Sequence, residues 1–264
     1  MTAVSPPDDA TPTPPEPLLE MRGVVKAFGS NVVYRDMDLA VRPGETLTVL
    51  GGSGTGKSVC LKLMIGLLYA DEGRVLFKGE DVGEMDAEAL THLRRQVAMV
   101  FQGGALFDSM TVEQNVVFGL REHTTMGQVQ MRDRAVECLT MVGLGLDFDP
   151  EILDKMPASL SGGMRKRVAL ARSIALKPEV ILYDEPTTGL DPPNCDRIAN
   201  MIRKLQTELG VTSVVVTHDI QTAWHVSDRV AMLLDRRFPY VDDVAAFRVS
   251  EIPEVRNFTQ RRVD

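Results

Sequence analysis

The sequence has few cysteines and no long apolar run. Its 264 residues include three cysteines, Cys60, Cys138 and Cys195, which lie far apart, form no CxxC pair and lack the spacing of metal ligands. A reducing cytosol suits this pattern better than a disulfide-bonded secreted domain. Nowhere do about 18 apolar residues follow one another, the length that a membrane-spanning helix needs. We therefore expect a chain that does not cross a membrane and that acts at one only through a partner.

An excess of basic residues is also absent. The chain has 29 lysines and arginines against 37 aspartates and glutamates, which gives a formal net charge of −8. Proteins that bind the phosphate backbone of nucleic acids usually have a basic face, so nucleic acid is not an expected partner. Short basic runs such as Arg165–Arg167 are more typical of solvated surface than of a binding patch.

The first 17 residues contain six prolines and lack the apolar segment and the basic start of a signal peptide. Proline at this density, together with low hydrophobicity, predicts a disordered tail over residues 1–17. We expect a folded domain over residues 18–240 and a carboxyl-terminal extension over residues 241–264.

Apolar runs that alternate with helical segments indicate an α/β protein. Buried strands are predicted at Thr46–Leu50, Val97–Phe101, Val180–Tyr183 and Ser213–Val216, and helices at about Lys57–Leu68, Asp86–Arg95 and Gly163–Leu176. Short alternating segments before residue 50 predict a small antiparallel β subdomain, and residues from about 103 to 164 predict a helical subdomain. The expected fold is a mainly parallel sheet with these two additions.

A glycine-rich segment after the first buried strand matches the phosphate-loop pattern GxxxxGK[ST] in full. It consists of Gly51, Gly52, Ser53, Gly54, Thr55, Gly56, Lys57 and Ser58. Glycines let successive backbone N–H groups face one anion, and the following helix adds its positive end. Lys57 is expected to reach the β- and γ-phosphates of ATP, and the Ser58 hydroxyl to ligate Mg²⁺. A turn that only joins strand to helix is the alternative, but the strand-loop-helix context favours a P-loop NTPase.

Asp184 and Glu185 follow the strand predicted at Val180–Tyr183, at the end where α/β sheets bind ligands. Unpaired acids are costly to bury, so two of them at a strand end indicate a function. We expect Asp184 to hold Mg²⁺, directly or through water, and Glu185 to orient or deprotonate the water that attacks the γ-phosphate. Acids that only cap a helix or form a turn are the alternative.

Gln102 and His218 each follow a predicted strand in the same way. The Gln102 amide can ligate Mg²⁺ or the attacking water, and the His218 ring can contact the γ-phosphate. Either residue alone would be typical of an ordinary strand end, so both assignments depend on the neighbouring phosphate loop.

A second anion cradle is predicted at Leu160, Ser161, Gly162 and Gly163, where a serine and two glycines begin a helix. One chain does not need two cradles for one triphosphate, so this one is expected to serve the ATP held by a second subunit. An ordinary helix that is capped by Ser161 is the alternative.

With these elements in this order, residues 18–240 resemble the ATP-binding cassette (ABC) ATPases. The matching motifs are GGSGTGKS, FQ at Phe101–Gln102, LSGGM, VILYDE and VVVTHD. The resemblance implies a head-to-tail dimer that closes on two molecules of ATP with Mg²⁺, and an integral-membrane permease as partner. It also implies that Asp191 belongs to the nucleotide site and that an aromatic residue stacks on the adenine. Phe28 matches that aromatic position, and Tyr34 is the less favoured alternative.

A narrower likeness is to the ATPase subunits of Mla-type, MCE-associated phospholipid transporters. It rests on FQGGALFDSMTVEQNVVFGLREHT at Phe101–Thr124 and on LSGGMRKRVALARSIALKPE. It implies phospholipid transport, an MCE-domain lipid-binding partner, and a cytoplasmic protein on the inner face of the cytoplasmic membrane. Near the carboxyl end the chain departs from the family, because Leu234–Phe238 lacks the usual turn glycine and Val241–Phe247 lacks the usual Gly-Thr.

Two alternatives to a phospholipid transporter fit the same residues. The ATPase can serve another importer or exporter, or it can be a soluble ABC-type scaffold or adaptor without a permease. The intact Asp184, Glu185 and His218 argue against a binding module that has lost catalysis.

Overall fold

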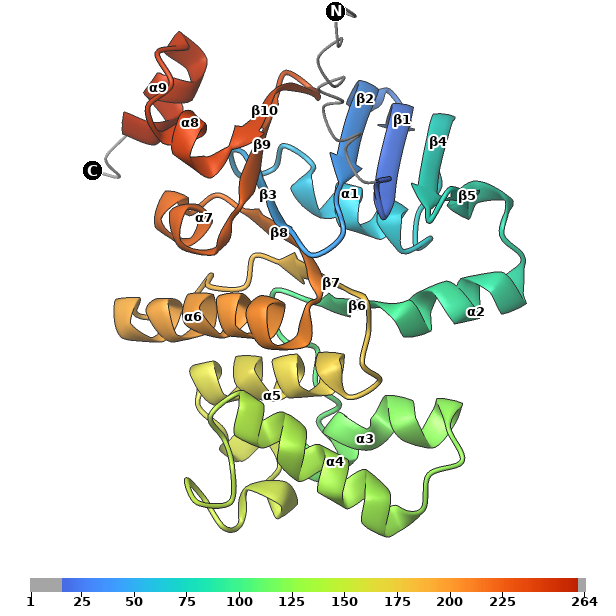
Figure 1. The fold of residues 1–264 in the computed structure, drawn as a ribbon, viewed down its shortest axis with the longest axis vertical. Helices are drawn as coiled ribbons and strands as arrows, with labels where there is room; N and C mark the ends of the chain where they lie inside the picture. The colour runs from blue at the N-terminus through green and yellow to red at the C-terminus, as the bar shows by residue number, and fades with distance from the viewer. Residues whose placement is uncertain (1–15, 261–264) are drawn as a thin grey trace, which may run out of the picture.

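Two β-sheets organise the chain in the computed structural model, which describes residues 16–260 (Figure 1). One is a four-stranded sheet in the order β2-β1-β4-β5, and the other is a six-stranded sheet in the order β10-β9-β3-β8-β7-β6. The tail predicted to be disordered, residues 1–17, lies outside the described residues except for its last two.

The six-stranded sheet is mainly parallel. Its strands are β3 (Thr46–Leu50), β6 (Val97–Val100), β7 (Val180–Asp184), β8 (Thr212–Thr217), β9 (Arg229–Leu234) and β10 (Arg237–Asp243). β3 pairs in parallel with β8 and β9, β7 pairs in parallel with β6 and β8, and β10 is antiparallel to β9. Every residue of β3, β7 and β8 is buried, as expected of strands covered on both faces. The predicted α/β fold is confirmed.

The four-stranded sheet is antiparallel and packs against the first helix. It contains β1 (Leu19–Phe28), β2 (Asn31–Val41), β4 (Glu72–Phe77) and β5 (Glu80–Asp81). Met21 of β1 shares a core with Leu61 of α1 (Lys57–Met64) and with Leu47 of β3. α1 is therefore held by both sheets, and its first residue lies close to the carboxyl end of β3.

α1 and α2 (Ala87–Gln96) begin where the sequence predicts, but only α2 ends there. The Asp86 side chain caps α2 by accepting a hydrogen bond of 2.8 Å from a backbone N–H three residues along the chain. α1 ends at Met64, about one turn before the predicted end, so that prediction was wrong. Gly66 has a φ of +65°, a left-handed conformation of the kind that ends a helix.

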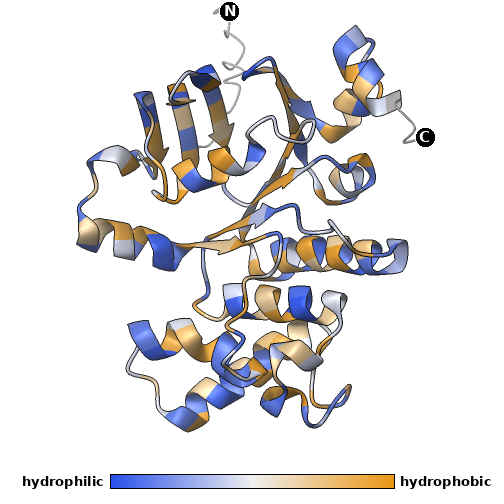
Figure 2. Ribbon diagram, turned by 180° about the vertical axis from the view of Figure 1, so that it is seen from behind, coloured by the Kyte–Doolittle hydropathy of each residue, from blue (hydrophilic) through white to orange (hydrophobic). Residues whose placement is uncertain are grey.

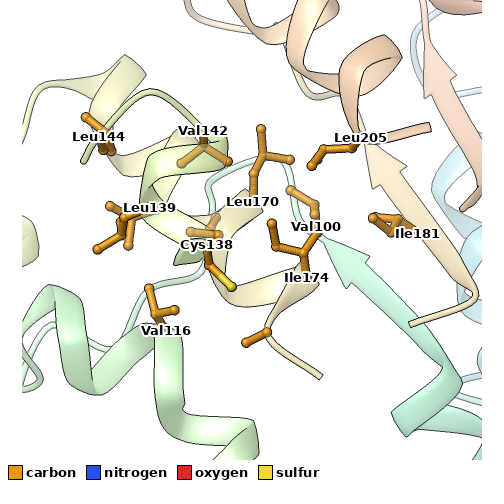
Figure 3. Close-up of a cluster of buried hydrophobic side chains, with 14 of the residues drawn as sticks. Val100, Val116, Cys138, Leu139, Val142, Leu144, Leu170, Ile174, Ile181 and Leu205 are labelled. Atoms are coloured by element: carbon orange, nitrogen blue, oxygen red, sulfur yellow. The ribbon is translucent and has the colours of Figure 1, made fainter. Parts of the chain in front are cut away.

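The helices between β6 and β7 form a layer of their own, at the bottom of Figure 1. They are α3 (Val112–His123), α4 (Gln128–Met141) and α5 (Gly162–Ile174), with the 3₁₀ turns η2 (Ile152–Asp154) and η3 (Pro157–Ser159). In the cluster of Figure 3, Val116 of α3 and Cys138 of α4 pack with Ile174 of α5. The same cluster includes Ile181 of β7, so α5 connects the helical layer with the parallel sheet.

The carboxyl-terminal segment packs on the edge of the parallel sheet. It contains α8 (Val244–Arg248) and α9 (Pro253–Gln260). The other elements of the chain are η1 (Val82–Glu84), which precedes α2, and the helices α6 (Pro192–Leu209) and α7 (Ile220–Val226), which precede and follow β8. Phe247 and Val255 are buried in one cluster with Met232 of β9. β10 crosses the boundary expected at residue 241, so the last strand of the sheet joins the two regions. Figure 2 shows hydrophobic residues along the central strands and polar residues on the outer helix faces.

Candidate active site

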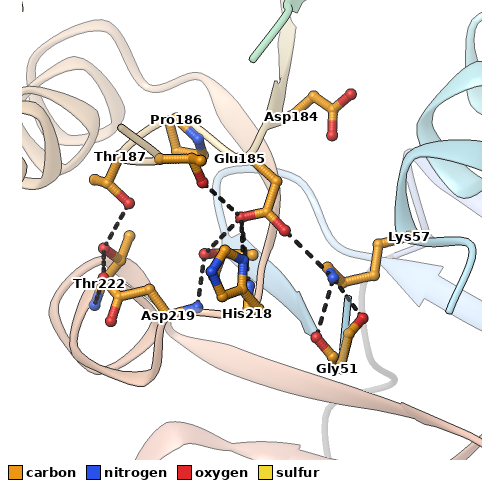
Figure 4. A network of polar contacts seen from close by, with 12 residues as sticks. Gly51, Lys57, Asp184, Glu185, Pro186, Thr187, His218, Asp219 and Thr222 are labelled. Atoms are coloured by element: carbon orange, nitrogen blue, oxygen red, sulfur yellow. Dashed lines mark hydrogen bonds and ion pairs between the residues drawn. The ribbon is translucent and has the colours of Figure 1, made fainter. Parts of the chain in front are cut away.

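Three neighbouring parallel strands end at the residues predicted to carry the chemistry. β3, β8 and β7 are adjacent in the sheet. β3 leads into Gly51–Ser58, β8 leads into His218, and β7 leads into Glu185. Because parallel strands end at a common edge, the three segments meet there, as Figure 4 shows.

The loop Gly51–Ser58 has a backbone that few residues other than glycine can adopt. Gly54 and Gly56 have φ values of +76° and +103°, which side chains strongly disfavour. A Cβ at Gly56 would lie 2.4 Å from Cγ1 of Val33. The Tyr34 hydroxyl donates a hydrogen bond of 2.6 Å to the Gly56 carbonyl. These contacts fix the loop at the amino end of α1, a combination that suits phosphate groups.

The Lys57 ammonium lies at the centre of this edge. Its Nζ donates hydrogen bonds of 3.0 and 2.9 Å to the carbonyls of Gly51 and Gly52 and lies 3.3 Å from Oε1 of Glu185. The side chain is buried, with 5% of its surface exposed. A cation confined between the phosphate loop and a carboxylate is placed to bind the charged end of a triphosphate.

Ser58 and Asp184 come together from different elements. The Ser58 hydroxyl donates a hydrogen bond of 2.7 Å to Oδ1 of Asp184. Proteins usually bind Mg²⁺ through only one or two oxygen ligands, while water molecules and substrate phosphates fill the other positions. The Ser58 hydroxyl and the Asp184 carboxylate fit this pattern. Within residues 16–260, no group of three or more His, Cys, Asp or Glu side chains could hold a metal by itself. The exposed Gln102 forms no hydrogen bond with either residue.

The Glu185 carboxylate is held on several sides. Oε2 lies 2.9 Å from Nδ1 of His218 and accepts hydrogen bonds from the hydroxyls of Thr188 and Thr217 at 3.2 and 3.3 Å. Oε1 faces Lys57. The structure therefore brings together Lys57, Glu185 and His218, three of the charged or titratable groups that the sequence places at this edge.

The charge state and backbone of Glu185 both depend on these neighbours. Burial raises the pKa of Glu185, but the hydrogen bond with His218 and the charge of Lys57 outweigh burial, so the pKa lies below its usual range. The carboxylate is therefore ionised at neutral pH and able to accept a proton. Its φ is +46°, a left-handed conformation that costs energy in a residue with a side chain and that the surrounding contacts must hold in place.

Phe28 and Tyr34 differ in exposure. Tyr34 is completely buried, while Phe28 at the end of β1 has 47% of its surface exposed. The Lys26 ammonium lies 5.4 Å from the centre of the Phe28 ring. Tyr34 has no free face for a base in this structure, so of the two candidates only Phe28 offers one.

The predicted second cradle lies apart from the first. Ser161 caps α5 by accepting a hydrogen bond of 3.2 Å from Met164 N. A Cβ at Gly163 would lie 3.1 Å from Oδ1 of Asn194, and Asn194 donates a hydrogen bond of 2.5 Å to Asp191, the residue before α6. Between described residues, no hydrogen bond or ion pair joins the segment that begins with Leu160 to the phosphate loop. Asn194 thus lies beside both Asp191 and the start of α5.

Two hydroxyl contacts of the site were not predicted. Thr188 lies three residues after Glu185, and Thr217 lies one residue before His218. The sequence could have indicated both, because each is a threonine within three residues of a proposed catalytic residue. Both support the Glu185 carboxylate rather than add a new chemical group.

Comparison with known proteins identifies the family. The family model described as ABC transporter matches residues 34–188, more than half of the chain. The chain belongs to the ABC transporter family. It is 36% identical, over 91% of its own length and 88% of the relative's, to the intermembrane phospholipid transport system ATP-binding protein MlaF of Escherichia coli (strain K12). It is 39% identical, over 92% of its length and 69% of the relative's, to a probable ribonucleotide transport ATP-binding protein of Mycobacterium leprae.

A solved structure supports the same assignment. It is a dimeric ATP-binding cassette in a post-hydrolysis state with ADP and phosphate bound, 32% identical to this ABC protein with a TM-score of 0.77. The match covers 86% of this chain and 98% of the other. The protein is therefore an ATP-binding, ATP-hydrolysing subunit of an ABC transporter. Among residues 16–260, no helix combines the length and the apolar character needed to span a membrane.

Proposed function

We propose that this ABC ATPase energises phospholipid transport between membranes as part of an Mla-type transporter. The supporting observation is the alignment with the E. coli phospholipid transport subunit, which extends over 88% of that protein. The ribonucleotide relative has a slightly higher identity, but the match leaves a larger part of that protein unpaired. The segment Phe101–Thr124 adds to the likeness with Mla-type subunits.

Catalysis is proposed to depend on the cluster around Glu185. Gly51–Ser58 cradles the phosphates of ATP, with Phe28 on the adenine and Lys57 on the β- and γ-phosphates. Glu185, ionised and held by His218, orients the attacking water and takes its proton. His218 is also proposed to contact the γ-phosphate, where it can stabilise the charge that develops.

Ser58 and Asp184 are the residues proposed to hold Mg²⁺, with Gln102 as a further oxygen ligand. When bound, the ion supplies positive charge to the phosphate oxygens during transfer. The support is the 2.7 Å contact between the Ser58 hydroxyl and the Asp184 carboxylate.

The complete site is proposed to need two chains arranged head to tail. The phosphate loop of one chain then faces Leu160–Gly163 and Asp191 of its partner. A shift from 1:99 open to 99:1 closed requires about 5.5 kcal/mol of differential binding, or about 2.7 kcal/mol for each of two ATP molecules. Charge-assisted contacts of Ser161 and the two glycines with a γ-phosphate are of this order.

The permease is proposed to dock in a groove between the helical layer and α2. A cavity of about 630 Å³ opens there. Its lining residues include His92, Leu120, Met126, Arg134 and Leu176. The groove is lined by both polar and apolar side chains and includes Leu120 of α3. A segment of a membrane partner that binds there would therefore be moved when the helical layer moves. We further propose, from the likeness to the phospholipid transport relative, that the protein works on the inner face of the cytoplasmic membrane with an MCE-domain subunit in the same complex.

Purification of the tagged chain from detergent-solubilised membranes tests this proposal. We expect a permease and an MCE-domain protein to copurify, with phospholipid bound to the complex. A complex with a solute-binding importer subunit and no bound lipid would instead support another importer. Recovery of the chain alone from both membrane and soluble fractions would support the adaptor alternative.

A further inference from the structure

Lys166 holds the loop that follows Glu185. It lies in the second turn of α5, and its Nζ donates hydrogen bonds of 2.6 Å to the Pro186 carbonyl and 2.8 Å to the Thr188 carbonyl. The side chain is half-buried. Burial lowers the pKa of Lys166, whereas the nearby Cys195 and Glu185 raise it. An ammonium withdrawn from water in this way depends on the two carbonyls for its remaining hydrogen bonds.

The loop that Lys166 contacts, residues 186–188, is hydrogen-bonded to the Glu185 carboxylate through Thr188. Glu185 and Gly189 both have positive φ, at +46° and +78°. The Thr188 N–H donates to the Glu185 carbonyl at 3.3 Å, and the Thr188 hydroxyl donates to Oε2 of Glu185 at 3.2 Å. A shift of the Thr188 carbonyl therefore moves a hydrogen-bond donor of the carboxylate.

The same helix begins with the second cradle. Ser161 caps α5, and Arg165 donates a hydrogen bond of 2.6 Å to the Leu160 carbonyl. Lys166 follows little more than one turn after Ser161, so the cap and the lysine lie on one short, hydrogen-bonded unit. Because α5 is one continuous helix, a displacement of its first residues also displaces Lys166.

We propose that Lys166 is a positioning residue that couples the two nucleotide sites of the dimer. It connects the cradle that serves the partner's ATP with the loop that positions the chain's own Glu185. The inference rests on the proposed two-chain site. Closure on the partner's nucleotide moves α5, Lys166 carries the Pro186 and Thr188 carbonyls with it, and Glu185 reaches its working position only then.

ATPase assays on the full chain test this role with three variants. Lys166→Met keeps the aliphatic stem but removes both hydrogen bonds, Lys166→Arg keeps a cation that can donate to both carbonyls, and Lys204→Met removes an exposed lysine from α6 as a matched control. We expect Lys166→Met to lower kcat about ten-fold, the scale of losing hydrogen bonds from a charged donor. The affinity for a fluorescent ATP analogue should stay within about two-fold, the Hill coefficient for ATP should fall toward 1, and Lys166→Arg should restore most of kcat.

Wild-type kcat and Hill coefficient in Lys166→Met would overturn the inference. So would an equal loss of kcat, nucleotide affinity and melting temperature that Lys166→Arg does not restore, because that pattern describes a purely structural lysine. Dimerisation of Glu185→Gln with ATP distinguishes failure of the coupling role from failure of the proposed two-chain site. If Glu185→Gln fails to dimerise with ATP, the shared site is wrong; if it dimerises while Lys166→Met remains fully active, only the coupling role is wrong.

Discussion

At the scale of single residues, the site depends on charges held close together in a small volume. Lys57, Glu185 and His218 come from three separate strand ends, and their contacts of 2.9 to 3.3 Å keep a cation, a carboxylate and an imidazole in one network. The residue types and their order in the chain were enough to predict this group. The left-handed backbone of Glu185 was not predictable, because glutamate has no preference for positive φ.

Replacement of Lys57 by alanine should weaken nucleotide binding. The change removes a buried ammonium from the phosphate loop, and the loss of charge-assisted hydrogen bonds of about 2 kcal/mol corresponds to about thirty-fold weaker binding. Titration of a fluorescent ATP analogue against both proteins measures the difference. Binding of the variant within about two-fold of wild type would contradict the assignment of Lys57.

The three cysteines should differ in reactivity. Burial raises the pKa of Cys60 to about 12 and, as the main cause, that of Cys138 to about 11. Burial also raises the pKa of Cys195, but this thiol is partly exposed whereas the other two are buried, so access by the reagent distinguishes it. A thiol reagent at pH 8 should therefore modify one cysteine in the native protein and three in urea, and Cys195→Ser should abolish the native signal. Modification of Cys60 or Cys138 in the native protein, detected by peptide mass, would contradict the packing described for them.

At the scale of secondary-structure elements, the central strands were the most predictable part. β3, β7 and β8 are rich in apolar and β-branched residues, as suits strands that are buried along their whole length. The end of α1 was mispredicted because the apolar spacing continues past Gly66 while the backbone does not. The turn between β9 and β10 has positive φ at Asp235 and Arg236, which explains why the absence of a glycine there is unusual.

Contacts between distant elements could not be derived from spacing. Lys166 meets Pro186 and Thr188 across about 20 residues of chain, and nothing in the periodicity of α5 distinguishes this lysine from its basic neighbours. The same holds for Arg172, which donates hydrogen bonds of 2.8 Å to the Gly104 and Ala105 carbonyls after β6. Such contacts follow from packing rather than from local sequence.

The joint between α6 and the parallel sheet should be sensitive to acid. Asp228 accepts hydrogen bonds from Arg203 and Gln206 of α6 and from the Thr46 N–H of β3, at 2.8, 2.6 and 2.8 Å. Burial raises the pKa of Asp228, but these donors outweigh burial and lower it. Its stabilising effect is therefore complete above the ordinary aspartate pKa of about 3.9 and is lost as the pH falls through the lower folded-state value.

Asp228→Asn should therefore lower the free energy of unfolding at pH 7. The difference from wild type should shrink progressively below about pH 4, because the aspartate of the wild type then becomes protonated. Urea denaturation across this range measures it, with the exposed Asp133→Asn as control. An equal difference at pH 7 and pH 3 would show that the charge of Asp228 does not stabilise the joint.

At the scale of the whole molecule, the sequence predicted the family and the architecture, and the structure supplied the separation of the two cradles. Gly51–Ser58 and Ser161–Gly163 each have the chemistry of an anion site, yet no described contact joins them in one chain. The relative position of the cradles depends on how α5 packs between the sheet on one side and α3 and α4 on the other, which short-range patterns do not encode.

The central claim is that ATP is bound between two chains. Light scattering of Glu185→Gln, with and without Mg²⁺ and ATP, tests it most directly, because this variant should bind ATP while turnover falls by about 10²-fold or more. We predict that its mass rises from 29.1 kDa to twice that value when ATP is added. In the same background, Ser161→Arg should bind ATP and remain a monomer. A Glu185→Gln protein that binds ATP yet stays at the monomer mass, or that hydrolyses ATP at the wild-type rate, would contradict the account.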